Sequence, residues 1–294
     1  MKQKNTALSM LLGTVKYMVI LLLAMILSAA IAIRMIDIAG VRYTQISWDE
    51  LTHRISNLEE DRSIVNEVES LSRSPLYEKK IVYDGDSIAE SRNNNGGGYA
   101  KLISDATDSV YVNFAKGGAR LSSHNSGHSV VKNLDKLPDD ADLYCFEGGI
   151  NDFWGNVPIG TCDPNDYTGE LDPSTICGAL ETIFRHCMDK FPGKPVCFVI
   201  THKIQNTAYG SNQNGDTFED YRNAMVTVCQ KYSIPYYDAF NESGLNGWNQ
   251  TQSKLYLTAN SSGKGDGIHP NEDGYRRYYA PQLLNLFERI IPME

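Results

Sequence analysis

From Lys80 onward, short apolar runs alternate with stretches of helical periodicity, and this alternation limits the chain to few folds. The predicted strands are 80–85, 109–115, 142–147, 195–201 and 234–239. The predicted helices are 97–106, 126–134, 175–191, 216–232 and 273–290. Strands that are separated by helices make right-handed crossovers and pair in parallel. We therefore expect an α/β domain over 80–294, in which helices cover both faces of a five-stranded parallel sheet.

The first predicted strand runs directly into a tight turn, Gly85-Asp86-Ser87, and then into a helix. Glycine lets the backbone bend sharply, so the Ser87 hydroxyl is presented at the carboxyl end of the strand, beside the free amides of a helix start. An open parallel sheet holds its ligands at this edge. Ser87 is therefore a candidate nucleophile, and the alternative is a serine that only caps the helix.

Three further motifs follow in order. The segment 113–119 (NFAKGGA) leaves the second strand through paired glycines, and Gly149-Ile150-Asn151-Asp152 leaves the third. Asp266-Gly267-Ile268-His269-Pro270 is predicted as a loop before the last helix. Together with the Gly-Asp-Ser turn, these motifs resemble the SGNH (GDSL-like) hydrolase family over roughly residues 80–290. The resemblance implies a serine esterase, and a flavodoxin-like three-layer α/β/α fold agrees with the alternation of strands and helices.

The chemistry of ester cleavage explains the residue types. A serine hydroxyl is a poor nucleophile at neutral pH, so a base must take its proton, and His269 is the candidate. Asp266, three residues earlier, can fix the tautomer of the imidazole. The family resemblance implies that the backbone amides of Ser87 and Gly118 and the side chain of Asn151 stabilise the oxyanion. Alternatives are an Asx turn at Asn151 and a surface pair of Asp266 and His269.

Three more residues are predicted to bind substrate: Asp152, Trp154 and His202. Each has a structural alternative, because Asp152 can be purely structural and Trp154 can belong to the core. His202, at the end of the fourth strand, can be a core or surface residue. The polar loop 155–175 is long enough to shape a pocket. The sequence indicates no metal and no cofactor.

Composition narrows the class of partner. The net charge is -9, although the first 34 residues hold four basic residues and no acid. An acidic body argues against nucleic acid. We expect a small-molecule or glycan ester as substrate, and deacetylation of an O-acetylated carbohydrate suits the Tyr-, Trp- and Asn-rich loops. Alternatives are a lysophospholipase or thioesterase, an extracytoplasmic O-acyltransferase, and, from a different class, a non-catalytic surface-binding module.

Residues 17–33 carry no charge and lie between Lys16 and Arg34. This length is at the lower end for a membrane-spanning helix. The three lysines before this segment predict that the N-terminus stays in the cytoplasm and that the rest of the chain lies outside the cell, as in an uncleaved signal anchor. A cleaved signal ending at Ala30-Ile31-Ala32 and a buried core helix are the alternatives. We expect a tail and anchor over 1–34 and a helical stalk over 35–79, which can self-associate or pack on the catalytic domain.

The six cysteines permit disulfides in an exported protein. Cys162 and Cys177 flank the 155–175 loop and are the best single pair for a bridge. Cys145 and Cys197 lie inside apolar strands and can equally be buried free thiols.

Overall fold

The computed structural model describes residues 24–25, 73–91, 98–124, 127–205 and 210–292. The chain divides into two units, 1–73 and 74–294. The predicted membrane segment 17–33, except Ala24 and Met25, lies outside the described residues, as does the predicted stalk up to residue 72. In the described part of the chain, no helix combines the length and the apolar character needed to cross a membrane.

Five strands form the central sheet of the second unit: β1 (Lys80–Asp84), β2 (Val110–Asn113), β3 (Leu143–Gly148), β4 (Val196–Ile200) and β5 (Tyr236–Asp238). All neighbours pair in parallel in the order β2-β1-β3-β4-β5. This is the flavodoxin-like order, in which the order of the strands along the sheet reverses between β1 and β3. The predicted five-stranded parallel sheet in an α/β fold is confirmed. Ligands of such sheets bind at the carboxyl ends of the strands beside this reversal.

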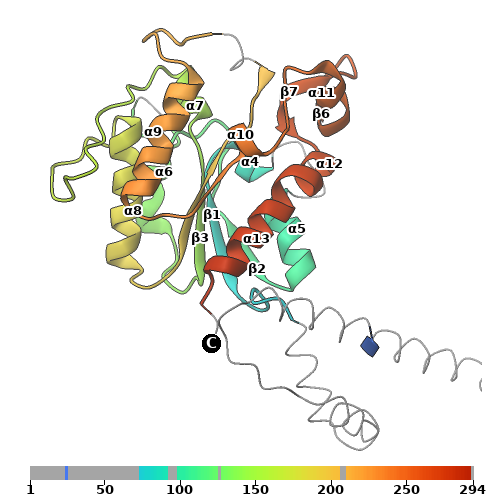
Figure 1. The fold of residues 1–294 in the computed structure, drawn as a ribbon, viewed down its shortest axis with the longest axis horizontal. Helices are drawn as coiled ribbons and strands as arrows, with labels where there is room; N and C mark the ends of the chain where they lie inside the picture. The colour runs from blue at the N-terminus through green and yellow to red at the C-terminus, as the bar shows by residue number, and fades with distance from the viewer. Residues whose placement is uncertain (1–23, 26–72, 92–97, 125–126, 206–209, 293–294) are drawn as a thin grey trace, which may run out of the picture. The chain divides into compact units, whose positions relative to one another are not determined.

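Helices cover both faces of the sheet (Figure 1). One face carries α5 (Tyr99–Thr107) and α13 (Ala280–Ile290), and the other carries α6 (Val130–Asn133), α8 (Ile176–Lys190) and α9 (Phe218–Lys231). Side chains of β1 alternate between the two cores. Ile81 and Tyr83 belong to the α5/α13 core, whereas Val82 belongs to the α8/α9 core. This alternation follows from the two-residue period of a strand.

The helix predicted after the Gly-Asp-Ser turn is α4 (Ser87–Glu90), and α12 (Glu272–Gly274) is at the start of the predicted helix 273–290. Several other short elements were not predicted. They are the 3-10 turn η1 (Leu134–Lys136), α7 (Ile150–Trp154), α10 (Ala239–Glu242), α11 (Gln250–Tyr256) and the antiparallel strands β6 (Leu257–Ala259) and β7 (Gly265–Pro270). The polar stretch 241–267, which has the composition of a loop, therefore contains helix and strand over much of its length. The predicted helix 126–134 shrinks to Val130–Asn133.

The predicted helix 273–290 is regular only from Ala280. Before it, Tyr275–Tyr279 form a π-helical segment, η3. Pro281 lies at the start of α13 and lacks the N–H that an uninterrupted α-helix would need there. The π-helical turn puts the Tyr275 and Tyr279 side chains in the core, where both are fully buried. Extra turns of this kind often occur at functional sites.

The last residues of the predicted stalk pack on the α/β domain. Leu76 has no exposed surface and belongs to the α5/α13 core. The Ser74 hydroxyl donates a hydrogen bond to Glu288 on α13 at 2.8 Å. The compact unit accordingly begins at Ser74, before the predicted boundary at Lys80.

All six cysteines are free thiols, so the Cys162–Cys177 bridge is not formed in this structure. Cys145 and Cys197 are buried opposite each other on β3 and β4. They behave as small apolar side chains of the sheet.

Candidate active site

The turn after β1 presents Ser87 at the first position of α4. The Asp86 side chain caps this helix by accepting a hydrogen bond from the Ile88 amide at 2.9 Å. Gly85 approaches β3 so closely that an added Cβ would lie 2.5 Å from the Glu147 carbonyl oxygen. Only glycine tolerates that approach, so the turn keeps Ser87 against the sheet edge. Ser87 is 7% exposed.

Asp266 and His269 lie on β7, in a strand rather than the predicted loop. The Nε2 atom of His269 is 2.9 Å from Ser87 Oγ, and its Nδ1 atom is 2.7 Å from Asp266 Oδ2. The other carboxylate oxygen of Asp266 accepts the amides of Ile268 and His269 at 2.8 and 2.9 Å. The three side chains that the sequence analysis proposed as catalytic are therefore in one hydrogen-bonded chain.

The electrostatics of Asp266 suit this arrangement. Burial alone would raise its pKa, but the hydrogen bonds from the His269 ring and from two backbone amides outweigh burial and lower the pKa below its ordinary value. An ionised Asp266 keeps the imidazole proton on Nδ1. The lone pair of Nε2 then faces the Ser87 hydroxyl, which is the arrangement a general base needs.

The glycine turn after β2 is tied to the Ser87 turn by two hydrogen bonds. The Lys116 amide donates to the Gly85 carbonyl at 2.9 Å, and the Gly117 amide donates to Glu90 on α4 at 2.7 Å. Gly118 has φ +80°, a left-handed conformation that disfavours any side chain. Because the Gly117 amide is engaged by Glu90, the Gly118 amide stays the candidate oxyanion donor of this turn.

Asn151 lies in the first turn of α7, directly after β3. Its Nδ2 atom donates to Asp86 Oδ2 at 3.0 Å. One of the two amide protons is thus held by the residue that precedes Ser87. The second proton is available for a substrate oxygen, so the predicted role of Asn151 as an oxyanion donor stays compatible with its position.

The structure corrects the predicted role of Asp152. This residue has no exposed surface, and its two carboxylate oxygens accept the amides of Leu121 and Ser122 at 2.9 and 3.0 Å. A buried carboxylate whose two oxygens are both engaged does not reach a substrate. Asp152 instead holds the chain that follows the glycine turn.

His202 also differs from its predicted role as a substrate-binding residue. The side chain is fully buried, and its Nδ1 atom lies 2.7 Å from the hydroxyl of Tyr279 on η3. Burial, and to a lesser extent the nearby His269, lower its pKa to about 3. A neutral, buried His202 is therefore a structural residue of the core near Asp266 and His269, and it does not contact substrate.

Two tryptophans with exposed side chains are connected to the site through neighbouring residues. Trp154 ends α7, three residues after Asn151, and is 39% exposed. Trp248, which the sequence analysis did not single out, is 43% exposed. Its neighbour Gly247 packs on the backbone of Gly267, where an added Cβ would lie 2.2 Å from the Gly267 oxygen. Trp248 is thus next to a residue that touches the catalytic strand.

Two further residues that the sequence analysis did not identify contact the Ser87 turn from the buried side. Tyr275 donates its hydroxyl to the Ile88 carbonyl at 2.8 Å. Glu147, on β3, has no exposed surface and accepts a hydrogen bond from Thr201 at 2.8 Å. The only signal for Glu147 was an acid directly after the uncharged run 143–146, at the end of a predicted strand.

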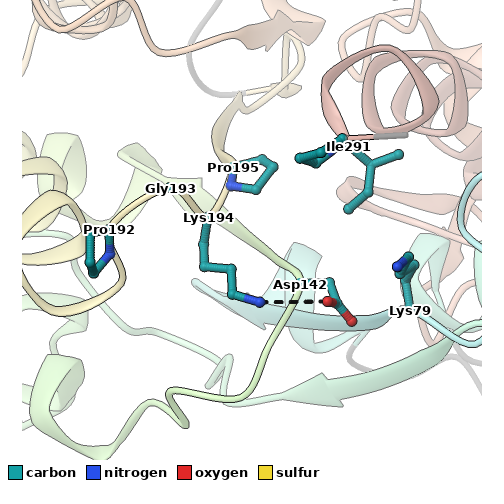
Figure 2. Close-up of a pocket in the computed structure, with 8 residues that line it drawn as sticks. Lys79, Asp142, Pro192, Gly193, Lys194, Pro195 and Ile291 are labelled. Atoms are coloured by element: carbon teal, nitrogen blue, oxygen red, sulfur yellow. Dashed lines mark ion pairs between the residues drawn. The ribbon is translucent and has the colours of Figure 1, made fainter. Parts of the chain in front are cut away.

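Neither of two surface cavities is part of this site. One, of about 210 Å³, contains the Lys194–Asp142 ion pair at 3.6 Å (Figure 2). Most of its residues precede β1, β3 or β4, so it opens at the amino ends of these strands, opposite Ser87. The second, of about 490 Å³, is formed around Tyr167 and Arg185 at the carboxyl ends of α8 and α9. Among the described residues, no cluster of side chains could hold a metal ion.

Comparison with known proteins identifies the family. The model of the GDSL-like Lipase/Acylhydrolase family matches residues 85–277, more than half of the chain. A protein from Lactobacillus plantarum is similar in structure, with a TM-score of 0.61 and 22% identity over 72% of this chain and 98% of its own. A possible lipase from Chitinophaga pinensis DSM 2588 has a TM-score of 0.57 and 20% identity over 72% and 98%.

A third solved structure shares 27% identity at a TM-score of 0.63, covering 74% of this chain and all of its own. Residues 85–277, which the family model matches, lie within the second unit and include Ser87, Asp266 and His269. No curated protein matches the sequence significantly.

Proposed function

The chain belongs to the GDSL-like lipase/acylhydrolase family and is an enzyme that acts on carboxylic esters, and we propose that it is a serine esterase that removes acetyl groups from a carbohydrate at the outer face of a membrane. The observation that carries the catalytic part is the continuous chain from Asp266 through His269 to Ser87, with distances of 2.7 and 2.9 Å. A serine nucleophile needs this alignment of acid, base and hydroxyl.

The reaction begins when Ser87 Oγ attacks the ester carbonyl carbon while its proton moves to His269 Nε2. Negative charge develops on the carbonyl oxygen, which accepts hydrogen bonds from the amides of Ser87 and Gly118 and from Asn151 Nδ2. The imidazolium then gives its proton to the leaving alcohol as the C–O bond breaks. Asp266 stabilises the imidazolium during this interval.

The second half returns the enzyme to its starting state. A water molecule attacks the acyl-enzyme carbonyl and gives a proton to His269. Collapse of this second intermediate releases the carboxylic acid, and His269 returns the proton to Ser87. In this scheme the described residues supply every proton transfer, with water as the second substrate.

Two features favour a carbohydrate as the alcohol. Trp154, three residues after Asn151, and Trp248, beside a residue that contacts β7, expose apolar ring faces with polar edges, and such rings suit the faces of a sugar. The segments 241–267 and 155–175 are rich in Asn, Ser and Asp, which hydrogen-bond to hydroxyl groups. Attachment to the membrane is proposed from the uncharged segment 17–33.

A hydrolysis panel tests the proposal. The full-length protein in detergent is assayed on p-nitrophenyl acetate, an acetylated oligosaccharide, lysophosphatidylcholine and an acyl thioester. We expect release of acetate from the first two substrates and its loss in Ser87→Ala, whereas the matched control Ser262→Ala, on an exposed turn, keeps full activity. Preference for the lysolipid or thioester would change the substrate class. An inactive wild-type protein would favour the non-catalytic binding module.

The same assay separates hydrolysis from transfer. With an unacetylated oligosaccharide added, a hydrolase releases acetate at an unchanged rate, whereas an acyltransferase forms the acetylated acceptor. Membrane attachment is tested by fractionation of cells that express the chain with and without residues 17–33. Attachment that survives the deletion, or a mature N-terminus after Ala32, would contradict the signal anchor.

A further inference from the structure

Glu147 is a buried acid that the catalytic scheme above does not use. It lies on β3, two residues before Gly149, and has no exposed surface. Thr201, after β4, donates its hydroxyl to Oε1 of Glu147 at 2.8 Å. On the other side, the Asp86 amide points to Oε2 at 3.4 Å. Glu147 thus lies directly beneath the turn that carries Ser87.

Glu147 and Asp86 are buried neighbours, since the Asp86 amide lies 3.4 Å from Glu147 Oε2. Two buried carboxylates that were both ionised would repel each other, so one of the pair holds a proton. Both oxygens of Asp86 already accept hydrogen bonds, from the Ile88 amide at 2.9 Å and from Asn151 Nδ2 at 3.0 Å, as those of an ionised carboxylate do. Burial raises the pKa of Glu147 well above its ordinary value, and the neighbouring Asp86 raises it further, which agrees with a proton on Glu147.

The position of this proton decides how Asn151 is oriented. An ionised Asp86 is an acceptor, so it faces the amide nitrogen of Asn151 rather than the amide oxygen; the contact is Nδ2 to Oδ2 at 3.0 Å. The second N–H of the same nitrogen is then directed to the oxyanion. If Asp86 carried the proton instead, the Asn151 oxygen could turn toward it and the oxyanion would lose its donor.

We propose that Glu147 is a positioning residue for the oxyanion hole, which donates a hydrogen bond to Asp86 and thereby keeps the Asn151 side-chain nitrogen facing the substrate. This inference rests on the proposed function of Asn151. It differs from a packing role because it requires a donor at position 147, not only a side chain of the right volume. Thr201 fixes the Glu147 carboxyl in the orientation that points this donor at Asp86.

Two substitutions separate these requirements. Glu147→Gln keeps both a donor toward Asp86 and an acceptor for Thr201, so kcat should stay within about threefold of wild type. Glu147→Leu keeps similar volume but no donor, so kcat on p-nitrophenyl acetate should fall about 10- to 100-fold, part of the 10²–10³ that an oxyanion donor supplies. KM should change less than about threefold, since the donor acts mainly in the transition state. Glu219→Gln and Glu219→Leu, at an exposed glutamate, serve as matched controls.

A double-mutant cycle tests the route through Asn151. If Glu147 acts through Asn151, then Glu147→Leu should lower kcat by no more than about threefold when Asn151 is already alanine. Melting temperature and circular dichroism establish that each variant is folded. Should Glu147→Leu not fold, Thr201→Val takes its place, with an expected decrease in kcat of about 3- to 10-fold that also vanishes in the Asn151→Ala background.

The outcomes distinguish this inference from the proposed function. An active wild type, an inactive Ser87→Ala and a Glu147→Leu variant with wild-type kcat would overturn the role of Glu147 alone. Additive effects of Glu147→Leu and Asn151→Ala would also overturn it, because the substitution would then act on Ser87 or on folding. Loss of activity in Glu147→Gln equal to that in Glu147→Leu would show that the charge, and not the donor, matters. An inactive wild-type protein would remove both proposals.

Discussion

The imidazole Nε2 of His269 lies 2.9 Å from the hydroxyl oxygen of Ser87, although 182 positions separate the two residues in the chain. Ser87 comes from the turn after β1, and His269 comes from β7 just before the last helices. The two meet because the β6–β7 hairpin packs at the carboxyl end of β1, an interior strand of the sheet. This contact is the geometric basis of every catalytic prediction below.

Asp266→Asn should reduce kcat by about 10²–10⁴ without unfolding the protein. The asparagine keeps Oδ1, which accepts the amides of Ile268 and His269. Its Nδ2 group would however face Nδ1 of His269 and move the imidazole proton to Nε2, where the ring can no longer accept the Ser87 proton. Steady-state kinetics and melting temperature measure both parts. Asp273→Asn, at an exposed aspartate of α12, is the control, and equal kcat values for the two variants would rule out the role of Asp266.

Asp84 should make the protein less stable as the pH rises toward neutrality. It is 1% exposed on β1, and burial raises its pKa to about 7 although the Gly85 amide donates to it. In the unfolded chain the pKa is about 4. Between these values the unfolded state loses its proton first, so stability falls as pH rises, by up to about 1.4 kcal/mol per pH unit, and levels off above pH 7.

Asp84→Asn tests this sign, because asparagine resembles the protonated acid and does not titrate. Relative to wild type, the variant should gain stability between pH 5 and pH 8 in urea unfolding. Exposed Asp135→Asn should show no such gain. A variant that loses stability relative to wild type over this interval would mean that Asp84 is favourably ionised in the folded protein.

Leu76→Ala should lower the free energy of unfolding by about 2–5 kcal/mol, because it opens a cavity in the core between β1 and α13. Leu255→Ala, at a side chain that is 53% exposed, should change it by less than about 0.5 kcal/mol. Urea denaturation measures both. Equal values would indicate that residues 74–79 act as a linker instead of a part of the domain.

Trp154→Ala and Trp248→Ala should each raise KM for an acetylated oligosaccharide by about 2- to 10-fold, while KM for p-nitrophenyl acetate stays unchanged. The small ester occupies the site of reaction but cannot extend to the indole rings. Tyr167→Ala is the matched control, since this exposed aromatic residue packs on the carboxyl end of α9, away from Ser87. An unchanged KM for the oligosaccharide in both tryptophan variants would argue against a carbohydrate substrate.

The sheet and the catalytic motifs could be predicted because both are encoded locally. Each of the five strands is a short apolar run, and the Ser87 turn follows the first of them. Polar residues were harder to place. Asp152 and His202 follow strands β3 and β4, as substrate-binding residues often do, yet burial gives each a structural partner, Ser122 or Tyr279. Burial depends on contacts between distant segments, which a single sequence does not reveal.

The same reason explains why β7 and Trp248 were missed. The strand Gly265–Pro270 contains Asp266, Gly267 and His269 and has no apolar alternation, so it read as a loop. Its conformation depends on pairing with β6 and on α11 packed beside it. Trp248 lies in a segment with no motif, and only the contact of Gly247 with Gly267 connects it to the site.

The most direct test of the catalytic account is the reaction of the full-length protein with an alkyl fluorophosphonate, followed by peptide mass spectrometry. We predict a single phosphonyl adduct per chain, on Ser87, with a rate of labelling that falls at least about 100-fold in His269→Ala because the serine loses its base. An adduct on a different serine, or an unchanged rate of Ser87 labelling in His269→Ala, would contradict the account.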